Sequence, residues 1–323
     1  MTLNRILLAR DFSPVSDHAL RYALDLAQRT GSELHMLYAR VLHEDAFAPD
    51  DPPSPSADVE AIRDRMQATG GDAPRGDAVP LVDAVERDVA AGPAILRYAT
   101  DHNIDLIVMG THGRRGVRRM LLGSVAEEVV RHADRPVMTV RGTEDEAAPA
   151  APAIDRILVP VDFSEPSRDA LHTAQAFAGL YGARLDVLHV IEDRLHPAFY
   201  VGGVQSLDRL EPRLNEKVAD ALDDFVVDAL GADALGADAE AALHVVRGRP
   251  VQRIPEFVED NGTDLVALST HGQTGLQHFL MGSVAQKVVR HVGCPVLTVK
   301  AFGRSLVEAS SESGVSQPSA AAE

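Results

Sequence analysis

Short apolar runs alternate along the chain with segments whose apolar residues recur every three to four positions. The runs that have the length and composition of buried strands lie at 6–8, 34–37, 106–109 and 137–140. Segments 18–30 and 124–133 have the period of an amphipathic helix. Strands that are apolar throughout, alternating with helices, are typical of a parallel sheet covered on both faces. The sequence therefore predicts an α/β fold.

This pattern occurs twice in the chain. Residues 104–140 align without a gap with residues 263–299, and 19 of these 37 positions are identical. Residues 5–20 likewise resemble residues 156–171. Each copy, at about 140–150 residues, is long enough for a core of its own. The predicted organisation is domain one at 1–142, a linker at 143–153, domain two at 154–302 and a disordered tail at 303–323.

The middle of each copy is where the two differ most. Domain two has a net eight extra residues there. We expect a loop and one helix around 58–67 in domain one, and a longer helix over 207–230 in domain two. The third strand of each sheet is predicted at 79–85 and at 242–246.

Composition narrows the classes of function. A formal charge of −17 argues against a nucleic-acid binder, which needs a basic surface for phosphates. No apolar run reaches the ~18 residues of a membrane span. The single cysteine, Cys294, excludes an intramolecular disulfide and favours a reducing compartment. Domain one has Arg135 at the matching position, which indicates a core or surface thiol rather than a reactive one. We expect a soluble, cytoplasmic protein that binds neither nucleic acid nor membrane.

A glycine-rich loop follows the fourth predicted strand and precedes a helix. In domain one, Gly110 and Gly113 are followed after nine residues by Gly123 and Ser124. Parallel sheets bind ligands at the carboxyl ends of their strands. Glycines can take up positive φ and let backbone N–H groups approach phosphate oxygens, to which a helix N-terminus adds partial positive charge. The loop therefore predicts an anion site.

The same residues also have a structural interpretation. Ser124 with Glu127, and Ser283 with Gln286, have the spacing of a capping box, which needs no ligand. A purely structural loop in at least one of the two copies therefore stays open.

Asp11 and Asp162 end the first predicted strand of their copies, at the same edge of the sheet as the loop. A carboxylate there can accept a hydrogen bond from a ribose hydroxyl or an adenine amine. Alternatively, the aspartate, or the nearby Ser13 or Ser164, caps the next helix. We favour ligand contact because the predicted topology places the aspartate beside the loop.

Other polar side chains gather in the loops. His112 and His271 lie in a shared Thr-His-Gly sequence, and no second ligand stands at metal-binding spacing, so we interpret them as loop-packing residues. Domain one carries four arginines there: Arg114, Arg115, Arg118 and Arg119. Domain two has Gln273, Thr274, Gln277 and His278 instead. Phosphate contact and simple solvation are equal alternatives for the arginines.

Taken together, these motifs resemble the universal stress protein family. Its nucleotide-binding members carry Gly-x-x-Gly, nine residues and Gly-Ser/Thr, and residues 157–164 and 188–190 look like its first two strands. The resemblance covers residues 1–302. It implies two Rossmann-like α/β domains, each with five parallel strands in the order 3-2-1-4-5 and helices on both faces. It also implies a stress-response sensor or regulator that binds ATP, alone or with Mg²⁺.

The resemblance implies ATP contacts from the first and second strands, the residue before the first glycine, and the glycine and serine positions. In domain one these are Asp11, Ala39, Met109, Gly110, Gly113, Gly123, Ser124 and Val125. In domain two they are Asp162, Val190, Leu268, Ser269, Gly272, Gly282, Ser283 and Val284.

Each copy departs from the family pattern. Ala39 is smaller than the usual valine, and Ser269 replaces a glycine. Domain two keeps the family's Gly-x-Pro as Gly248-Arg249-Pro250, where Asp88 and Ala90 stand in domain one. We expect the better phosphate loop in domain one and the better adenine-side frame in domain two.

The resemblance further implies that strands 137–140 and 296–299 pair antiparallel, which joins the domains into an intramolecular pseudo-dimer. A homodimer of the full chain stays open, as do two alternative functions: a nucleotide-free interaction scaffold and a slow ATPase. The motifs of nucleotidyl transferases, ATP pyrophosphatases and P-loop NTPases are absent. We therefore assign no catalytic residue and no metal ligand.

Overall fold

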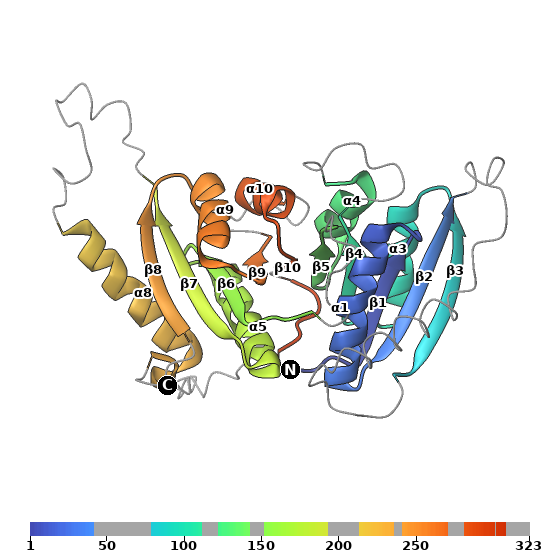
Figure 1. Cartoon of the computed structure of the whole chain (residues 1–323), viewed down its shortest axis with the longest axis horizontal. Helices are drawn as coiled ribbons and strands as arrows, with labels where there is room; N and C mark the ends of the chain where they lie inside the picture. The colour runs from blue at the N-terminus through green and yellow to red at the C-terminus, as the bar shows by residue number, and fades with distance from the viewer. Residues whose placement is uncertain are drawn as a thin grey trace, which may run out of the picture.

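The computed structural model describes residues 1–41, 79–111, 122–142, 152–192, 213–235, 241–270, 281–300 and 302–307. Within them, ten strands form a single sheet in the order β3-β2-β1-β4-β5-β10-β9-β6-β7-β8 (Figure 1). Each half of this sheet has the predicted order 3-2-1-4-5. Parallel pairing within each half, as between β1 and β2 and between β6 and β7, confirms the predicted fold class.

Domain one contributes the first half of the sheet and the helices that cover it. Its elements are β1 (Arg5–Arg10), α1 (Pro14–Thr30), β2 (Glu33–Val41), β3 (Leu81–Asp88), α3 (Ala91–Asp101), β4 (Leu106–Gly110), α4 (Ser124–His132) and β5 (Val137–Val140). The third strand begins two residues later than predicted and extends three residues further. The helix expected around 58–67 lies outside the described residues.

Domain two repeats this plan. Its elements are β6 (Arg156–Val161), α5 (Glu165–Tyr181), β7 (Arg184–Ile191), α8 (Leu214–Leu230), the 3-10 turn η2 (Ala232–Leu235), β8 (Ala241–Arg247), α9 (Pro250–Asn261), β9 (Leu265–Ser269), α10 (Ser283–His291) and β10 (Val296–Val299). Of the helix expected over 207–230, the structure describes the part from 213 onward.

The first helix of each domain is delimited by matching local signals. Ser13 and Ser164 are the N-caps, and their hydroxyls accept the backbone N–H of the residue three positions on. A proline follows in the first turn of each helix. Gly31 and Gly182 end α1 and α5 in the left-handed conformation, with φ of 70° and 68°, which glycine adopts without strain.

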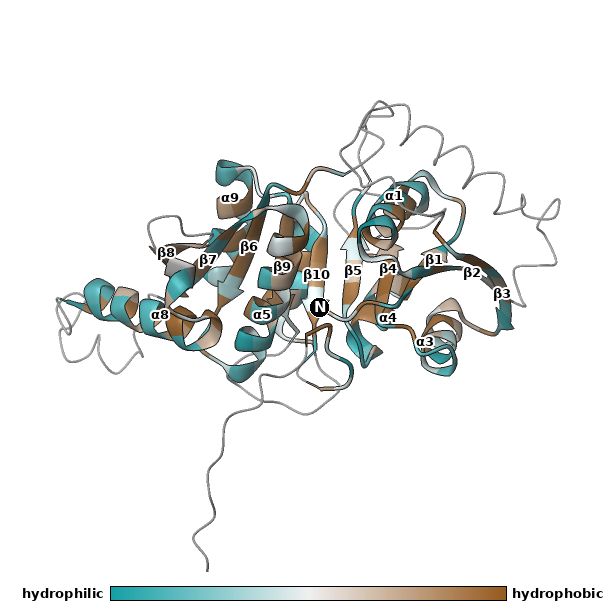
Figure 2. Ribbon diagram, turned by 90° about the horizontal axis from the view of Figure 1, so that it is seen from below, coloured by the Kyte–Doolittle hydropathy of each residue, from teal (hydrophilic) through white to brown (hydrophobic). Residues whose placement is uncertain are grey.

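Two apolar cores lie on opposite faces of the sheet, and each runs through both domains. Alternate residues along a strand belong to different cores: Ile6 and Leu8 face one, and Leu7 faces the other. Helices α1, α5 and α8 cover the first core, and α3, α4, α9 and α10 cover the second. Figure 2 shows apolar residues concentrated on the central strands and polar residues on the outer side of α8.

The two halves of the sheet meet at β5 and β10, which pair antiparallel as predicted, with Leu297 opposite Met138. Two threonines reinforce this pairing across the domain boundary. The hydroxyl of Thr298 donates to the carbonyl of Val137 at 3.0 Å, and that of Thr139 donates to the carbonyl of Val296 at 3.4 Å. The domains therefore share one sheet as an intramolecular pseudo-dimer.

After β10 the chain returns to domain one. The carbonyl of Leu306 accepts the backbone N–H of Thr2 at 2.8 Å, and the Leu306 side chain is buried in the first core. Arg304 donates to Asp105 at 2.7 Å. We expected a disordered tail from residue 303. For residues 303–307 that expectation is wrong, because a small polar sequence here includes one buried leucine and one paired arginine. Residues 308–323, and 143–151 of the predicted linker, lie outside the described part.

Candidate functional site

The predicted ligand residues that the structure describes come together at the carboxyl edge of the sheet in each domain. In domain one, Ala9 pairs with Met109 and Arg10 pairs with Tyr38, so Asp11 follows β1 beside Ala39 and Gly110. In domain two, Val161 pairs with His189, which brings Asp162 next to Val190. Leu268 and Ser269 end the neighbouring strand β9.

Both glycine loops are closed by the same pair of backbone hydrogen bonds. In domain one the N–H of Thr111 donates to Val140 on β5 at 2.9 Å, and the N–H of Gly123 donates to the Thr111 carbonyl at 2.7 Å. In domain two Thr270 donates to Val299 at 3.0 Å and Gly282 donates to Thr270 at 2.8 Å. The two ends of each loop are thus tied together and to the strand at the domain boundary.

The interiors of the loops lie outside the described residues. They contain Gly113 and Gly272 of the predicted sites, His112 and His271, the four arginines of domain one, and their counterparts in domain two. The predicted roles of these residues stay predictions.

The helix after each loop begins one residue earlier than a capping box requires. Gly123 and Gly282 are the N-caps of α4 and α10, and neither helix has a side-chain cap hydrogen bond. Ser124 and Ser283 are therefore already helical and exposed, so the capping-box interpretation is wrong. The first N–H groups of each helix therefore have no capping side chain. They make each helix start a favourable position for an anion.

The reason for glycine at these caps also differs from our expectation. Gly123 and Gly282 have φ of −62° and −58°, so no positive φ is needed. A Cβ on Gly282 would instead lie 3.3 Å from the carbonyl oxygen of Thr270, a tight contact with backbone. Glycine thus permits the close approach that forms the loop-closing hydrogen bond.

Asp11 and Asp162 organise the turn between the first strand and helix of their domains. Asp11 Oδ1 accepts the backbone N–H and the hydroxyl of Ser13, at 3.1 and 2.6 Å. Asp162 does the same with Ser164, at 3.2 and 2.5 Å. The serine, not the aspartate, caps the helix. The aspartate orients that cap and keeps its place at the carboxyl edge.

The residue after each of these aspartates is strained, a feature that sequence reasoning missed. Phe12 and Phe163 have φ of 60° and 63°, a conformation that costs a non-glycine residue about 1 kcal/mol. The same strain occurs at the same place in both domains, beside the predicted site. The repeated Asp-Phe-Ser sequence was the available signal, but phenylalanine gives no hint of a left-handed backbone.

The third strands end differently in the two domains. In domain two Gly248 has φ of 136° and Pro250 starts α9. In domain one the Asp88 carboxylate accepts the backbone N–H of Val89 at 2.6 Å and a hydrogen bond from Arg97 at 2.6 Å. Arg97 and this backbone contact lower the pKa of Asp88. A carboxylate of the chain itself thus lies close to the start of α3.

Cys294 and Arg135 occupy matching positions after the last helix of each domain. Cys294 packs beside the second core, and burial raises the pKa of its thiol to about 12, which suits the predicted unreactive thiol. Arg135 is buried and donates to the carbonyl of Ile104 at 2.7 Å and to that of Ala99.

Among the described residues, no group of three or more His, Cys, Asp or Glu could hold a metal ion. No helix in this part of the chain combines the length and apolarity that crossing a membrane requires.

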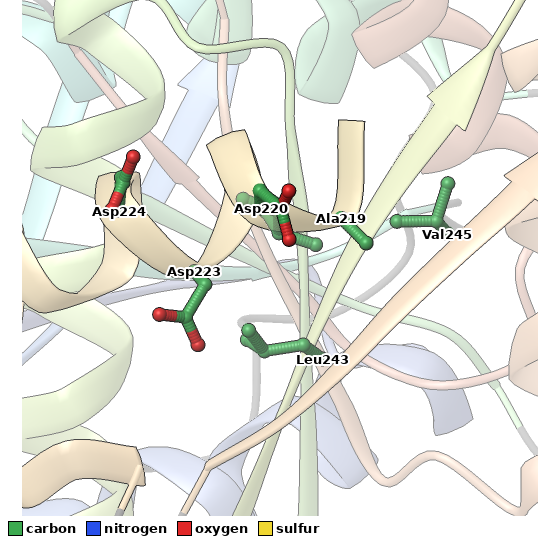
Figure 3. A pocket seen from close by; sticks show the side chains of 7 residues that line it. Ala219, Asp220, Asp223, Asp224, Leu243 and Val245 are labelled. Atoms are coloured by element: carbon green, nitrogen blue, oxygen red, sulfur yellow. The ribbon is translucent and has the colours of Figure 1, made fainter. Parts of the chain in front are cut away.

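A cavity of about 560 Å³ lies elsewhere, between α8 and β8. Its lining residues are Ala219, Asp220, Leu222, Asp223, Asp224, Leu243 and Val245. In Figure 3, Leu243 and Val245 on the strand lie beside the helix that carries the three aspartates. This lining has three carboxylates and no basic side chain, so it would repel a phosphate. We therefore place the candidate site at the glycine loops.

Comparison with known proteins gives a consistent result. The model of the universal stress protein family matches residues 2–141 and 153–300. Universal stress protein MJ0577 of Methanocaldococcus jannaschii is 29% identical over 153 residues, which are 45% of this chain and 94% of that protein. Universal stress protein Rv1996 of Mycobacterium tuberculosis is 27% identical over 238 residues, 71% of this chain and 65% of that protein.

Solved structures share the fold across both domains. A universal stress protein from Archaeoglobus fulgidus aligns with a TM-score of 0.57 and 22% identity, covering 93% of this chain and 97% of that one. A Pseudomonas aeruginosa protein described as a universal stress protein aligns with a TM-score of 0.64 and 17% identity, covering 93% and 94%. At this identity the likeness establishes the architecture alone.

Proposed function

The chain belongs to the universal stress protein family as a tandem member with two such domains, and on that premise we propose that it binds ATP at the two glycine-loop edges. In this proposal residues 1–142 and 154–302 are the binding domains, joined by the linker 143–153. Binding makes the chain a stress-response sensor or regulator in the cytoplasm, the compartment that its single cysteine favours.

One observation carries the proposal. In each domain an uncapped helix N-terminus, a loop closed by the Gly–Thr hydrogen bond and the first-strand aspartate meet at one edge of the sheet. Uncapped N–H groups at a helix start fit a phosphate. The tight space at Gly282 fits a loop whose backbone must lie close to its neighbours.

Each part of the site has a role in this proposal. The N–H groups around Gly123 and Ser124, and around Gly282 and Ser283, bind the phosphates. Asp11 and Asp162 accept a hydrogen bond from the ribose or the adenine. Ala39 and Val190 line the adenine side, where the larger valine gives domain two more apolar contact. Mg²⁺, where present, accompanies the phosphates.

The test is isothermal titration of ATP into the full-length chain after native purification, with a check for co-purified nucleotide. We expect two sites. Gly123→Val and Gly282→Val should each weaken one site by about tenfold or more, because the added side chain opens the loop end. Gly293→Val is the matched control, since a Cβ on Gly293 meets nothing within 4 Å.

Other outcomes identify the alternatives. No heat with ATP and no bound nucleotide would leave the interaction scaffold as the function. Steady-state phosphate release that Gly113→Val abolishes would instead indicate a slow ATPase.

A further inference from the structure

In each domain a backbone hydrogen bond ties the start of the glycine loop to the strand at the domain boundary. The residue after that strand contacts the other domain. In domain one Val140 accepts the N–H of Thr111, and the next residue is Arg141. Its guanidinium donates to the carbonyls of His291 and Val292, at 3.1 and 2.9 Å. These carbonyls end α10, the helix that follows the glycine loop of domain two.

Domain two returns the same contact. Val299 accepts the N–H of Thr270, and the next residue is Lys300, which is 5% exposed. Its ammonium donates to the carbonyls of Val130 and Arg131, at 2.5 and 3.2 Å. These carbonyls lie at the end of α4, the helix that follows the glycine loop of domain one. Helix ends leave carbonyls without partners inside the helix, and a cation there is stabilising.

The two helices also contact each other directly. Glu127, in the first turn of α4, accepts hydrogen bonds from Arg290 at 2.8 Å and Gln286 at 3.0 Å, both on α10. Figure 1 shows α4 and α10 on either side of β5 and β10, near the same end of the sheet. The starts of these helices are the proposed phosphate sites, so one set of contacts links the supports of both.

We propose that Lys300 is a positioning residue for the nucleotide site of domain one and Arg141 for that of domain two, so that each site is supported by a cation of the other domain. This inference rests on the proposed function. Its physical basis is the shortness of α4 and α10, which are 9 residues each, about 13 Å from end to end. Fixing the last turn of so short a helix fixes the orientation of its first N–H groups as well.

The two sites should therefore influence each other. Ligand that fixes the start of one helix also restrains the strand and the cation that support the opposite helix. The second binding event then loses less conformational freedom, and the coupling must be equal in both directions.

The test measures each site separately in the full-length chain. The Gly282→Val background reports the ATP affinity of domain one, and the Gly123→Val background reports that of domain two. Lys300→Met keeps most of the side-chain stem and removes the charge. We expect it to weaken binding by about threefold to tenfold in the Gly282→Val background and by less than about twofold in the other.

Arg141→Met should have the opposite selectivity. Lys300→Arg should restore binding to domain one, because it returns a donor cation to the end of α4. A merely structural role would affect both sites alike, so equal losses in the two backgrounds, or none in either, would overturn the proposal.

Hydrogen exchange of the nucleotide-free chain separates this inference from the proposed function. Lys300→Met should speed exchange in α4 more than in α10, and Arg141→Met should do the reverse. With wild-type chain that binds no ATP, the proposed function fails whatever the exchange pattern. With wild-type chain that binds ATP, unchanged exchange in both helices contradicts the inference alone. If Lys300→Met does not fold, Lys300→Gln decides the same question.

Discussion

Domains one and two have the same strands in the same order, yet different side chains hold the matching ends of their helices. After the last helix, domain one has a buried arginine, Arg135, where domain two has Cys294. Arg141 of domain one donates to a carbonyl at the end of α10, and Lys300 of domain two donates to one at the end of α4. The backbone bonds that close the loops, by contrast, are nearly equal in the two copies, at 2.7 and 2.8 Å. Duplication has thus preserved the loop ends while the side chains around them diverged.

The C-terminal segment makes the two domains unequal in a further way. Residues 302–307 follow domain two, but their described contacts are with domain one, at Thr2, Asp105 and Asp134. Residues 303–307 thus pack against domain one.

The largest effect is expected at Gly303. It has φ of 87°, and a Cβ there would lie 2.0 Å from the carbonyl oxygen of Asp134. Gly303→Ala should displace the segment that carries buried Leu306 and lower the free energy of unfolding by about 4 kcal/mol. Gly231 is the control, since its φ is 89° but a Cβ on it would meet nothing within 4 Å. Gly231→Ala should cost only the backbone strain of about 2 kcal/mol. Equal costs in chemical denaturation would show that the segment does not support domain one.

The next largest loss of stability is expected at Arg135, compared with its counterpart Cys294. Arg135→Met removes a buried cationic donor from the carbonyls of Ala99 and Ile104, and we expect a loss of about 3 kcal/mol. Cys294→Ala removes one packed sulfur and should cost about 1 kcal/mol. The measurement is denaturant unfolding of both variants. If Arg135→Met costs no more than Cys294→Ala, the arginine has no structural role that the thiol lacks.

The fold was predictable because its signals repeat along the chain. Apolar strands, helix period and the duplicated motif indicated the two sheets, and the resemblance supplied the strand order and the pairing of 137–140 with 296–299. The position of Asp11 and Asp162 at the carboxyl edge was predictable from the topology, although their bonds to Ser13 and Ser164 were not anticipated. Their role in ligand binding stays a prediction.

The features that the sequence did not predict depend on contacts between residues far apart in the chain, which leave no local pattern. Arg141 and Lys300 are single basic residues after a strand, and nothing nearby in the sequence indicates a helix end in the other domain. Leu306 lies in a polar stretch that has the composition of a tail. The capping box failed for another reason: Ser283 and Gly282 are both good N-caps, and the tight approach of Gly282 to the Thr270 carbonyl favours the glycine.

The pH dependence of stability should distinguish Lys300 from its counterpart Arg141. Burial lowers the pKa of Lys300 to about 8 from an ordinary 10.5. The unfolded chain therefore holds this proton more tightly, and stability rises as pH increases from about 8 to 10.5. We expect a rise of about 3 kcal/mol from this group. Lys300→Arg stays charged throughout and should lack the rise.

Comparing wild type with Lys300→Arg cancels what the other titrating groups contribute to the pH dependence of stability. Cys294 and Tyr22 have pKa values raised to about 12, so they lower stability as pH rises above their ordinary values, and they do so equally in both proteins. The measurement is denaturant unfolding across the window. Parallel stability curves for wild type and Lys300→Arg would contradict the prediction.

The smallest effect concerns a contact that has no counterpart across the pseudo-dimer among the described residues. Asp25 on α1 is fully buried, and it accepts a hydrogen bond from the hydroxyl of Tyr181 on α5 at 2.7 Å and two from Arg29. Burial raises the pKa of Asp25, so each donor matters for keeping its charge. Tyr181→Phe removes one donor and should cost about 1 kcal/mol. The control is Tyr22→Phe on the same helix as Asp25, which should change stability by less than half as much. If both variants unfold at the wild-type denaturant concentration, the domains are held by their shared sheet and cores, and the asymmetric contact adds nothing to their docking.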